Sequence, residues 1–336
     1  MGHPMPDGRL SVTLPGAIVG HATDPLLASG VTAIVFDAPA VAAVAVLGGA
    51  PGGRELGMLE PDMTVERVDA IVLSGGSAFG LDAAGGVQAA LREDGRGFAV
   101  AGLRVPLVPQ AILFDLANGG DKAWGRFAPY RDMGYAAARA ASAAPFALGS
   151  VGAGTGATTA TVKGGLGAAR AVTAAGHTIA AIVAVNALGS PLIGDGPWFW
   201  AAPFEVGQEF GGLGWPPRIT ADDVALRVKR RVQPSTTIGL VVTDAALTKA
   251  QAKRLAIMAH DGLARAVLPA HAPMDGDTIF AAATGTTALA DPVAELTALG
   301  HAAAQVFARA VARGVFEATA LALPRSLPSW HDRFTI

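Results

Sequence analysis

The sequence contains no cysteine, and charged side chains make up only 15% of its 336 residues. Without cysteine the chain has no disulfides, no thiolate-bound zinc and no cysteine nucleophile. The 25 lysines and arginines are balanced by 27 aspartates and glutamates, a formal net charge of −2, so the bulk charge does not favour nucleic acid or an anionic membrane as a partner. The 51% of apolar residues favours a large core, and part of the surface is expected to meet other subunits.

Long apolar segments are also missing. The longest stretch without a charged residue runs from Ala171 to Gly194, and it contains His177, Asn186 and Pro191 among several glycines and threonines. Such a composition is unfavourable for a membrane-spanning helix. The N-terminal residues lack the basic segment followed by an apolar one that is typical of a secretory signal. We therefore expect a cytoplasmic protein with no membrane partner.

Short apolar runs between glycine-rich turns predict six buried strands, which indicates an α/β protein. The runs are 33–36, 41–47, 70–73, 179–185, 238–242 and 279–283. Two helices are indicated most clearly. One runs from Thr248, as its N-cap, to Val267. The other begins with Asp291 as cap and Pro292 in the first turn, and it stops near Gly314.

One of these strands is opened by a hydroxyl residue, because Pro234, Ser235 and Thr236 lead directly into the run 238–242. Threonine is common at the start of strands for packing reasons alone, which is one interpretation. The other is self-cleavage, in which the Thr236 hydroxyl attacks the carbonyl of Ser235 and the resulting ester is hydrolysed. Thr236 would then be an N-terminus whose α-amine, with a pKa of about 7.7–8.0, takes the proton from its own hydroxyl.

Two carboxylates, Asp275 and Asp277, flank a glycine just before the last predicted strand. In an extended chain residues two apart project to the same face, so both could converge on one site and orient a terminal ammonium. Asp-Gly is also a common hairpin turn. Together with His271, or with His260 and Asp261, the pair could instead bind a divalent metal, although this spacing matches no strong metal motif.

Two further polar residues lie beside glycine-rich or apolar segments. The glycine-rich run 152–165 contains Lys163, but it lacks the lysine position of a phosphate-binding loop and the acidic residue of a dinucleotide site. No nucleotide cofactor is therefore indicated, and Lys163 is either a source of positive charge for an oxyanion or a solvated lysine. Asn186 follows the run 179–185, where an amide could donate to an oxyanion or cap the next turn.

Six strings, spread over nearly the whole chain, carry a family resemblance. They are PGAIVGHATD at 15–24, GGAPGGRE at 48–55, VDAIVLSGGSAFGLDAA at 68–84, GAGTGATTATVKGGLG at 152–167, STTIGLVVTDA at 235–245 and MDGDTIFA at 274–281. In this order they resemble the L-aminopeptidase/D-Ala-esterase/amidase family. That family includes β-peptidyl aminopeptidases and the 6-aminohexanoate (nylon) oligomer hydrolases.

The resemblance implies an αββα sandwich of the self-processing N-terminal-nucleophile hydrolase type, formed by one catalytic domain over 1–336. The chain would cut itself between Ser235 and Thr236 into 1–235 and 236–336, chains of 235 and 101 residues. It also implies Thr236 as the nucleophile with its own amine as base, and no metal or organic cofactor.

The other matching positions receive roles from the same resemblance. Asp275 and Asp277 would position the amine and the hydroxyl of the nucleophile. Lys163 and Asn186 correspond to the family's lysine and asparagine near that nucleophile, with Asn186 as the oxyanion donor.

Two positions depart from the family pattern. Phe114 stands where the nylon-oligomer hydrolases have an active-site tyrosine, so a hydroxyl donor is missing from this substrate-pocket position. Ser235 precedes the cut where the family usually has Asn or Gly. Self-processing is expected to be slower, because a serine backbone is less free to adopt a strained geometry than a glycine backbone.

A threonine nucleophile with an Asp-Gly-Asp motif is more similar to the nylon-oligomer hydrolases, since β-peptidyl aminopeptidases typically pair a serine with Ser-x-Glu. We therefore expect an amide hydrolase that acts on linear amides or short peptides through an acyl-enzyme. An aminopeptidase or amidase that releases N-terminal residues, including β- or D-amino acids, is the alternative. More remote alternatives are acyl transfer, because 235–245 is faintly similar to ornithine acetyltransferases, and an uncleaved scaffold protein.

The expected partners follow from this activity. They are a small-molecule amide or short-peptide substrate and further copies of the chain. Apolar composition and the family resemblance suggest a homo-oligomer of cleaved protomers, for which a tetramer is one arrangement.

Overall fold

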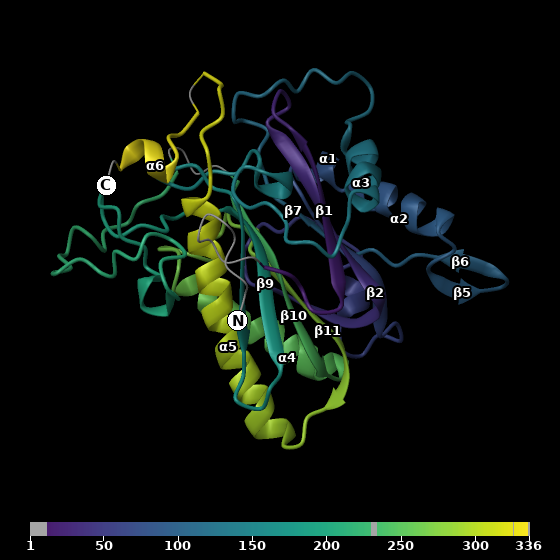
Figure 1. The fold of residues 1–336 in the computed structure, drawn as a ribbon. Helices are drawn as coiled ribbons and strands as arrows, with labels where there is room; N and C mark the ends of the chain where they lie inside the picture. Colours follow the sequence, from purple (N-terminus) through teal and green to yellow (C-terminus); the bar gives the residue numbers. More distant parts are fainter. Residues whose placement is uncertain (1–11, 230–233, 325, 335–336) are drawn as a thin grey trace.

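Nine strands hydrogen-bond into one mixed sheet in the computed structural model, which describes residues 12–229, 234–324 and 326–334. Their order is β3-β7-β4-β2-β11-β10-β9-β8, and β1 adds to β2 (Figure 1). The strands are β1 (Ala17–Asp24), β2 (Ser29–Val46), β3 (Gly53–Arg54), β4 (Arg67–Ser74), β7 (Gln110–Ile112), β8 (Leu166–Val172), β9 (Thr178–Asn186), β10 (Thr236–Ala246) and β11 (Thr278–Ala288).

Six α-helices accompany the sheet in the same part of the chain. They are α1 (Ser77–Gly80), α2 (Ala83–Glu93), α3 (Tyr130–Arg139), α4 (Lys249–Ala264), α5 (Pro292–Phe316) and α6 (Trp330–Arg333). Three short 3-10 helices are η1 (Gly57–Leu59), η2 (Gly152–Gly154) and η3 (Ala202–Phe204). No helix within these described ranges is both long and apolar enough to cross a membrane.

The long strand β2 folds the sheet into two layers. Residues 37–39 are exposed in the middle of the strand, and its register with β4 shifts between Val35 and Ala40. Because side chains alternate along a strand, each half of β2 presents one face to the other layer and one face outward. Before the bend the odd-numbered residues pack against α2 and α3, and after it they pack against α4 and α5.

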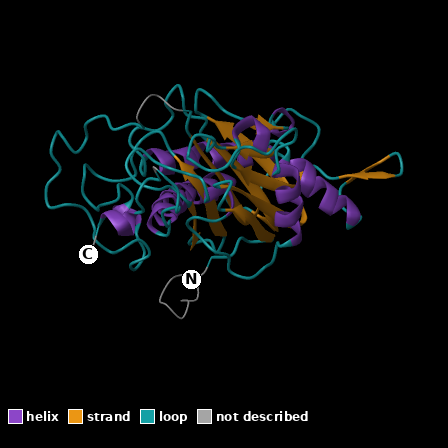
Figure 2. Ribbon diagram, turned by 90° about the horizontal axis from the view of Figure 1, so that it is seen from above, coloured by secondary structure: helices purple, strands orange, loops and turns teal. Residues whose placement is uncertain are grey.

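The even-numbered residues of both halves of β2 face a core that lies between the two layers. This core also contains Ile71 of β4, Ile182 of β9, Leu240 of β10 and Phe280 of β11, and all four are fully buried. Helices therefore cover both outer faces of a folded sheet, with the strands between them (Figure 2). The expected αββα arrangement is confirmed.

The predicted strands and helices are mostly present, with different boundaries. The runs 33–36 and 41–47 are the two halves of β2 rather than separate strands, because strand geometry continues through the bend. The other four runs fall in β4, β9, β10 and β11. Thr248 caps α4 through a capping box with Gln251, and α5 follows its Asp291 cap but continues two residues beyond Gly314 to Phe316.

A two-stranded hairpin, β5 (Phe98–Val100) and β6 (Leu103–Val105), projects from the body of the molecule (Figure 2). Phe98 pairs with Val105 and Val100 pairs with Leu103, so these four apolar side chains share one face of the ribbon. They are between 43% and 64% exposed. An isolated hairpin is only marginally stable in water. Soluble proteins also rarely leave neighbouring apolar side chains uncovered, so this exposed apolar face is unusual for a surface element.

Candidate active site

Thr236 is the first residue of β10, and the sheet holds it between two polar neighbours. On one side its cross-strand partner is Asn186, the last residue of the antiparallel strand β9. On the other side β11 runs parallel to β10, and the loop from Asp275 to Asp277 leads into it. Ser235 forms a parallel bridge with Asp275. Residues that lie far apart in the sequence thus meet at one end of three central strands.

The carbonyl oxygen of Ser235 accepts two hydrogen bonds. The Thr236 hydroxyl donates one, with Oγ1 2.5 Å from this oxygen, and the backbone N–H of Gly276 donates the other at 2.8 Å. Ser235 and Thr236 are both buried, so water does not compete for these bonds. The hydroxyl therefore lies against the peptide bond that self-cleavage would break, and Gly276 polarises the carbonyl of that bond.

Only glycine fits at position 276. A Cβ atom there would lie 2.6 Å from Thr236 Oγ1 and 2.8 Å from the carbonyl oxygen of Ala50, and both distances are shorter than real Cβ contacts. The missing side chain lets the loop backbone approach the carbonyl of Ser235. The Asp-Gly-Asp motif is thus not only a pair of carboxylates but also a backbone donor between them.

The two carboxylates lie beside the Ser235–Thr236 bond without contacting the hydroxyl. Asp275 accepts from the N–H groups of Leu188 and Ala272, both at 3.2 Å. Asp277 accepts from the N–H of Thr237 at 2.9 Å through Oδ1. Its Oδ2 accepts from the backbone N–H of His271 and contacts the His271 ring Nδ1, both at 2.9 Å. Both aspartates are therefore held in place by the loops around Thr236.

The two aspartates also interact with each other. Burial, and next the charge of Asp277, raise the pKa of Asp275 to about 6. Nearby backbone N–H groups and Lys229 oppose this rise by stabilising the carboxylate. Asp275 can thus take up a proton closer to neutral pH than an ordinary carboxyl group.

Asn186 is fixed by three partners. Its Oδ1 accepts from the N–H of Thr158 at 3.0 Å and from the ammonium of Lys229 at 3.1 Å. Its Nδ2 donates to the carbonyl oxygen of Phe114 at 3.0 Å. The amide expected to serve as oxyanion donor is therefore oriented, with one of its two N–H groups bound to Phe114 in the uncut chain.

Lys163 is fully buried, and its ammonium donates to the carbonyl oxygens of Gly154 at 3.0 Å and Gly164 at 2.8 Å. Burial lowers the pKa of Lys163 to about 7, although the charge of Asp115 opposes this. The interpretation of Lys163 as a solvated lysine is therefore wrong.

Lys229 is a site residue that the sequence did not reveal, since it stands in a mixed basic segment six residues before Ser235. Its ammonium donates to both the backbone oxygen and Oδ1 of Asn186 at 3.1 Å, and its N–H donates to the carbonyl of Leu188 at 3.1 Å. Burial lowers its pKa to about 7, opposed by the charge of Asp275. Its burial and its contacts with Asn186 come from the tertiary structure and leave no signal in the sequence.

Asp115 is a second residue that the sequence did not reveal. It is buried, and it accepts from the Ser29 hydroxyl at 2.6 Å and the Gly76 N–H at 2.8 Å. Burial raises the pKa of this carboxyl group. In the sequence, only the position next to Phe114 pointed to Asp115 as a residue of the site.

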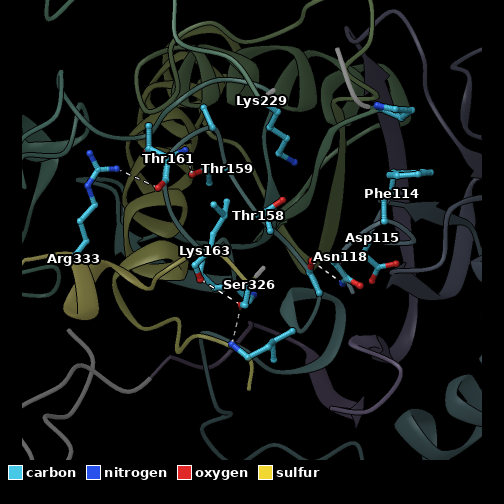
Figure 3. A pocket seen from close by; sticks show the side chains of 16 residues that line it. Phe114, Asp115, Asn118, Thr158, Thr159, Thr161, Lys163, Lys229, Ser326 and Arg333 are labelled. Carbon is cyan, nitrogen blue, oxygen red and sulfur yellow. Dashed lines mark hydrogen bonds between the residues drawn. The ribbon is translucent and has the colours of Figure 1, made fainter. Parts of the chain in front are cut away.

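A cavity of about 700 Å³ lies near this site, and Pro234, the residue before Ser235, is part of its lining. Its wall includes Phe114, Asp115, Lys163, Lys229 and Pro234 (Figure 3). The described residues that line it do not include Thr236, Asp275 or Asp277. Phe114 thus lines a cavity near Thr236, and its role in binding a substrate stays a prediction.

A metal site would need the histidines and the two aspartates to converge on one point. No group of three or more His, Asp or Glu side chains in residues 12–229, 234–324 and 326–334 is placed to hold a metal ion. His260 contacts the carbonyl oxygen of Ala45 at 3.0 Å, and its ring lies edge-on to that of His271, with centroids 4.8 Å apart. His271 in turn is bound to Asp277.

The two buried lysines predict how stability depends on pH. Lysine in an unfolded chain has a pKa of about 10.4, so between about pH 7 and 10 the unfolded chain holds protons that the folded chain lacks. Stability should therefore rise with pH above 7, by at most about 1.4 kcal/mol per pH unit for each lysine. Lys163→Met in a Thr236→Ala background should reduce this rise, measured by urea unfolding at pH 7 and 9.

Lys253→Met is the matched control, because Lys253 is partly exposed and pairs with Glu60 at 2.8 Å. An equal rise of the unfolding free energy in the Lys163→Met protein and its parent would contradict the account of a buried, readily deprotonated Lys163.

Comparison with solved structures supports the fold. A β-aminopeptidase from a Burkholderia species aligns with a TM-score of 0.66 and 22% identity, covering 96% of this chain and 93% of that one. The L-aminopeptidase D-Ala-esterase/amidase of Ochrobactrum anthropi, described as a variant of the Ntn hydrolase fold, aligns with a TM-score of 0.66 and 19% identity over the same shares.

Relatives found by sequence have a higher identity to this chain than these solved structures. The chain is 42% identical over 324 residues to an uncharacterized aminopeptidase of Mycobacterium tuberculosis, covering 91% of this chain and 90% of that protein. It is 29% identical over 291 residues to the 6-aminohexanoate-oligomer endohydrolase of an Agromyces species, covering 82% and 75%. The model of peptidase family S58 matches residues 12–326. The chain therefore belongs to peptidase family S58.

Proposed function

We propose that this protein is a self-processing aminopeptidase or amidase with Thr236 as its nucleophile. One observation carries the proposal: the Thr236 hydroxyl and the Gly276 N–H converge on the carbonyl oxygen of Ser235, at 2.5 and 2.8 Å. The reacting groups are thus held together before any reaction, and a donor already lies on the oxygen that becomes negative. Thr236 is buried and does not line the cavity, so cleavage would also give the nucleophile access to a substrate there.

The proposed cleavage is an acyl shift followed by hydrolysis. Thr236 Oγ bonds to the carbonyl carbon of Ser235, the carbon–nitrogen bond breaks, and the proton of the hydroxyl ends on the departing nitrogen. Water then cleaves the ester, which leaves a carboxylate on Ser235 and a free hydroxyl and amine on Thr236. No external oxidant, metal or co-substrate other than water is needed for this sequence.

The same residue then hydrolyses substrates. The Thr236 amine takes the proton from its own hydroxyl, Oγ attacks the substrate carbonyl, and the protonated leaving amine departs from an acyl-enzyme that water hydrolyses. We assign Asp275 and Asp277 to orienting the Thr236 amine, because both carboxylates are already fixed on either side of Gly276. Asn186 is assigned to the oxyanion through the N–H that Phe114 does not bind.

Lys163 is assigned to the electrostatics of the same step. Its buried ammonium shares the wall of the cavity with Lys229, close to Asn186. A lysine with a pKa near 7 can carry or release a proton at working pH, so it supports charge development without a permanent cost of burial.

The comparisons favour a different class of substrate from the one that the Asp-Gly-Asp motif favours. The motif favoured the nylon-oligomer hydrolases, but the identity to the mycobacterial aminopeptidase is higher and spans more of both proteins than the identity to the oligomer endohydrolase. We therefore favour release of N-terminal residues from short peptides or amides over cleavage within linear oligomers. Phe114, which replaces the tyrosine of the nylon-oligomer hydrolases, is in keeping with this choice.

The nucleophile is tested by three variants at neighbouring positions. Thr236→Ala should remain one chain, and its rate of aminoacyl p-nitroanilide hydrolysis should fall by about 10³-fold or more, because nucleophile and base are lost together. Thr236→Ser should keep both reactions. Thr237→Ala removes the adjacent hydroxyl, which faces the opposite side of β10, and should also keep both. Processing or full activity in the Thr236→Ala protein would exclude Thr236.

The substrate class is tested by blocking the amino end. An aminopeptidase should cleave a free tripeptide and should leave its N-acetylated form uncleaved, whereas an endohydrolase should cleave both. Products are measured by chromatography, with 6-aminohexanoate oligomers and acetylornithine as further substrates. Equal rates on the free and acetylated peptides would favour the oligomer hydrolase, and acetyl transfer from acetylornithine would favour the acyltransferase.

We also propose that cleaved protomers assemble into a homo-oligomer. The apolar face of the β5–β6 hairpin, with Phe98, Val100, Leu103 and Val105 exposed, supports a contact with another copy of the chain. Light scattering on the processed protein should give a mass of several protomers, and Leu103→Lys should lower that mass. A monomeric mass for the unaltered protein at micromolar concentration would refute the assembly.

A further inference from the structure

The cavity wall carries four charged side chains among the residues that the structure describes: Asp115, Lys163, Lys229 and Arg333. The first three are buried and bound to the protein itself, Asp115 to Ser29 and Gly76 and the lysines to backbone or amide oxygens. Arg333 differs, because its side chain is 27% exposed and its guanidinium is always protonated. It is thus the accessible, permanent positive charge of this wall.

Arg333 lies at the end of the cavity that is farther from Thr236, where the proposed reaction takes place. Figure 3 shows it on the opposite side from Phe114 and Asp115. The Phe114 carbonyl binds Asn186, the cross-strand partner of Thr236, so the Phe114 side is the end where the scissile bond lies. Arg333 comes from the short helix α6 near the C-terminus.

The segment from Thr158 to Thr161 joins the two ends. Thr158 donates its N–H to Asn186 at 3.0 Å, and the carbonyl oxygen of Thr161 accepts from the Arg333 guanidinium at 3.2 Å. Three residues span at most about 11 Å. A peptide that extends from the reaction end by one to three residues beyond its cleaved bond would therefore place its terminus near Arg333.

Arg333 already binds a carboxylate that can be exchanged. Its other guanidinium nitrogen donates to Asp195 at 3.1 Å, and the Asp195 side chain is 74% exposed. Exposed ion pairs of this kind contribute little to stability. Asp195 also has a second cation, Arg227, at 3.7 Å, so it keeps a partner if Arg333 binds another carboxylate.

We propose that Arg333 is a binding site for the C-terminal carboxylate of a short peptide, located on the leaving-group side of the scissile bond. This rests on the proposed function, and it narrows the substrates to peptides with a free C-terminus a few residues beyond the cleaved bond. The guanidinium fork matches the two oxygens of a carboxylate, so binding adds charge-assisted hydrogen bonds at a fixed distance from the nucleophile.

The test compares a tripeptide with its C-terminal amide. For the processed protein, kcat/KM should be about tenfold or more higher for the free acid, chiefly through KM. In Arg333→Gln this ratio should fall towards one. Arg227→Gln is the matched control, because Arg227 also contacts Asp195 but does not line the cavity, and its ratio should stay at the value of the unaltered protein. Asp195→Asn should keep or raise the ratio.

Binding is measured in parallel, because it does not depend on turnover. Calorimetry on the Thr236→Ala protein should show tighter binding of a dipeptide than of its amide, and Arg333→Gln in the same background should remove the difference. If Arg333→Gln fails to fold, Arg333→Lys replaces it, and loss of the two-pronged guanidinium contact should still lower the preference for the dipeptide over its amide. Equal binding of dipeptide and amide, or a rate ratio that Arg333→Gln leaves unchanged, overturns the carboxylate site. No hydrolysis of either peptide together with selective binding contradicts the proposed function and supports the carboxylate site.

Discussion

The site depends on one carbonyl oxygen, that of Ser235, which lies between the Thr236 hydroxyl and the N–H of Gly276. Three features of the fold make this contact. Strand β10 starts at Thr236, β11 runs beside it in parallel, and a glycine in the loop before β11 allows the backbone to approach within hydrogen-bond distance. Since all of these groups are buried, their alignment does not depend on mobile surface side chains.

The pKa shifts of the charged groups around Thr236 share one physical cause. These groups are buried near the ends of strands that are covered on both faces. Desolvation disfavours every charged form here, so it lowers the pKa of Lys163 and Lys229 and raises that of Asp275. Groups that titrate near neutral pH can move protons at working pH. The folded sheet therefore does more than position these residues, because it also buries them and so shifts their pKa values.

The sequence predicts the fold better than it predicts the contacts around Thr236. Apolar runs revealed β9, β10 and β11, and caps revealed α4 and α5, because these signals are local. Lys229 and Asp115 could not be recognised, since their burial comes from segments distant in sequence, and the bend of β2 hid the fact that two runs form one strand. The structure brings the paired carboxylates next to Ser235 and Thr237, but their hydrogen-bond partners could be found only in the tertiary structure.

The proposed function depends on self-cleavage of the chain at a single bond, between Ser235 and Thr236. Intact mass and amino-terminal sequencing of the purified protein test it most directly. The account predicts a small chain that begins with Thr236 and Thr237 and a large chain that ends at Ser235. A single full-length species after prolonged incubation, or a small chain with a different first residue, would contradict it.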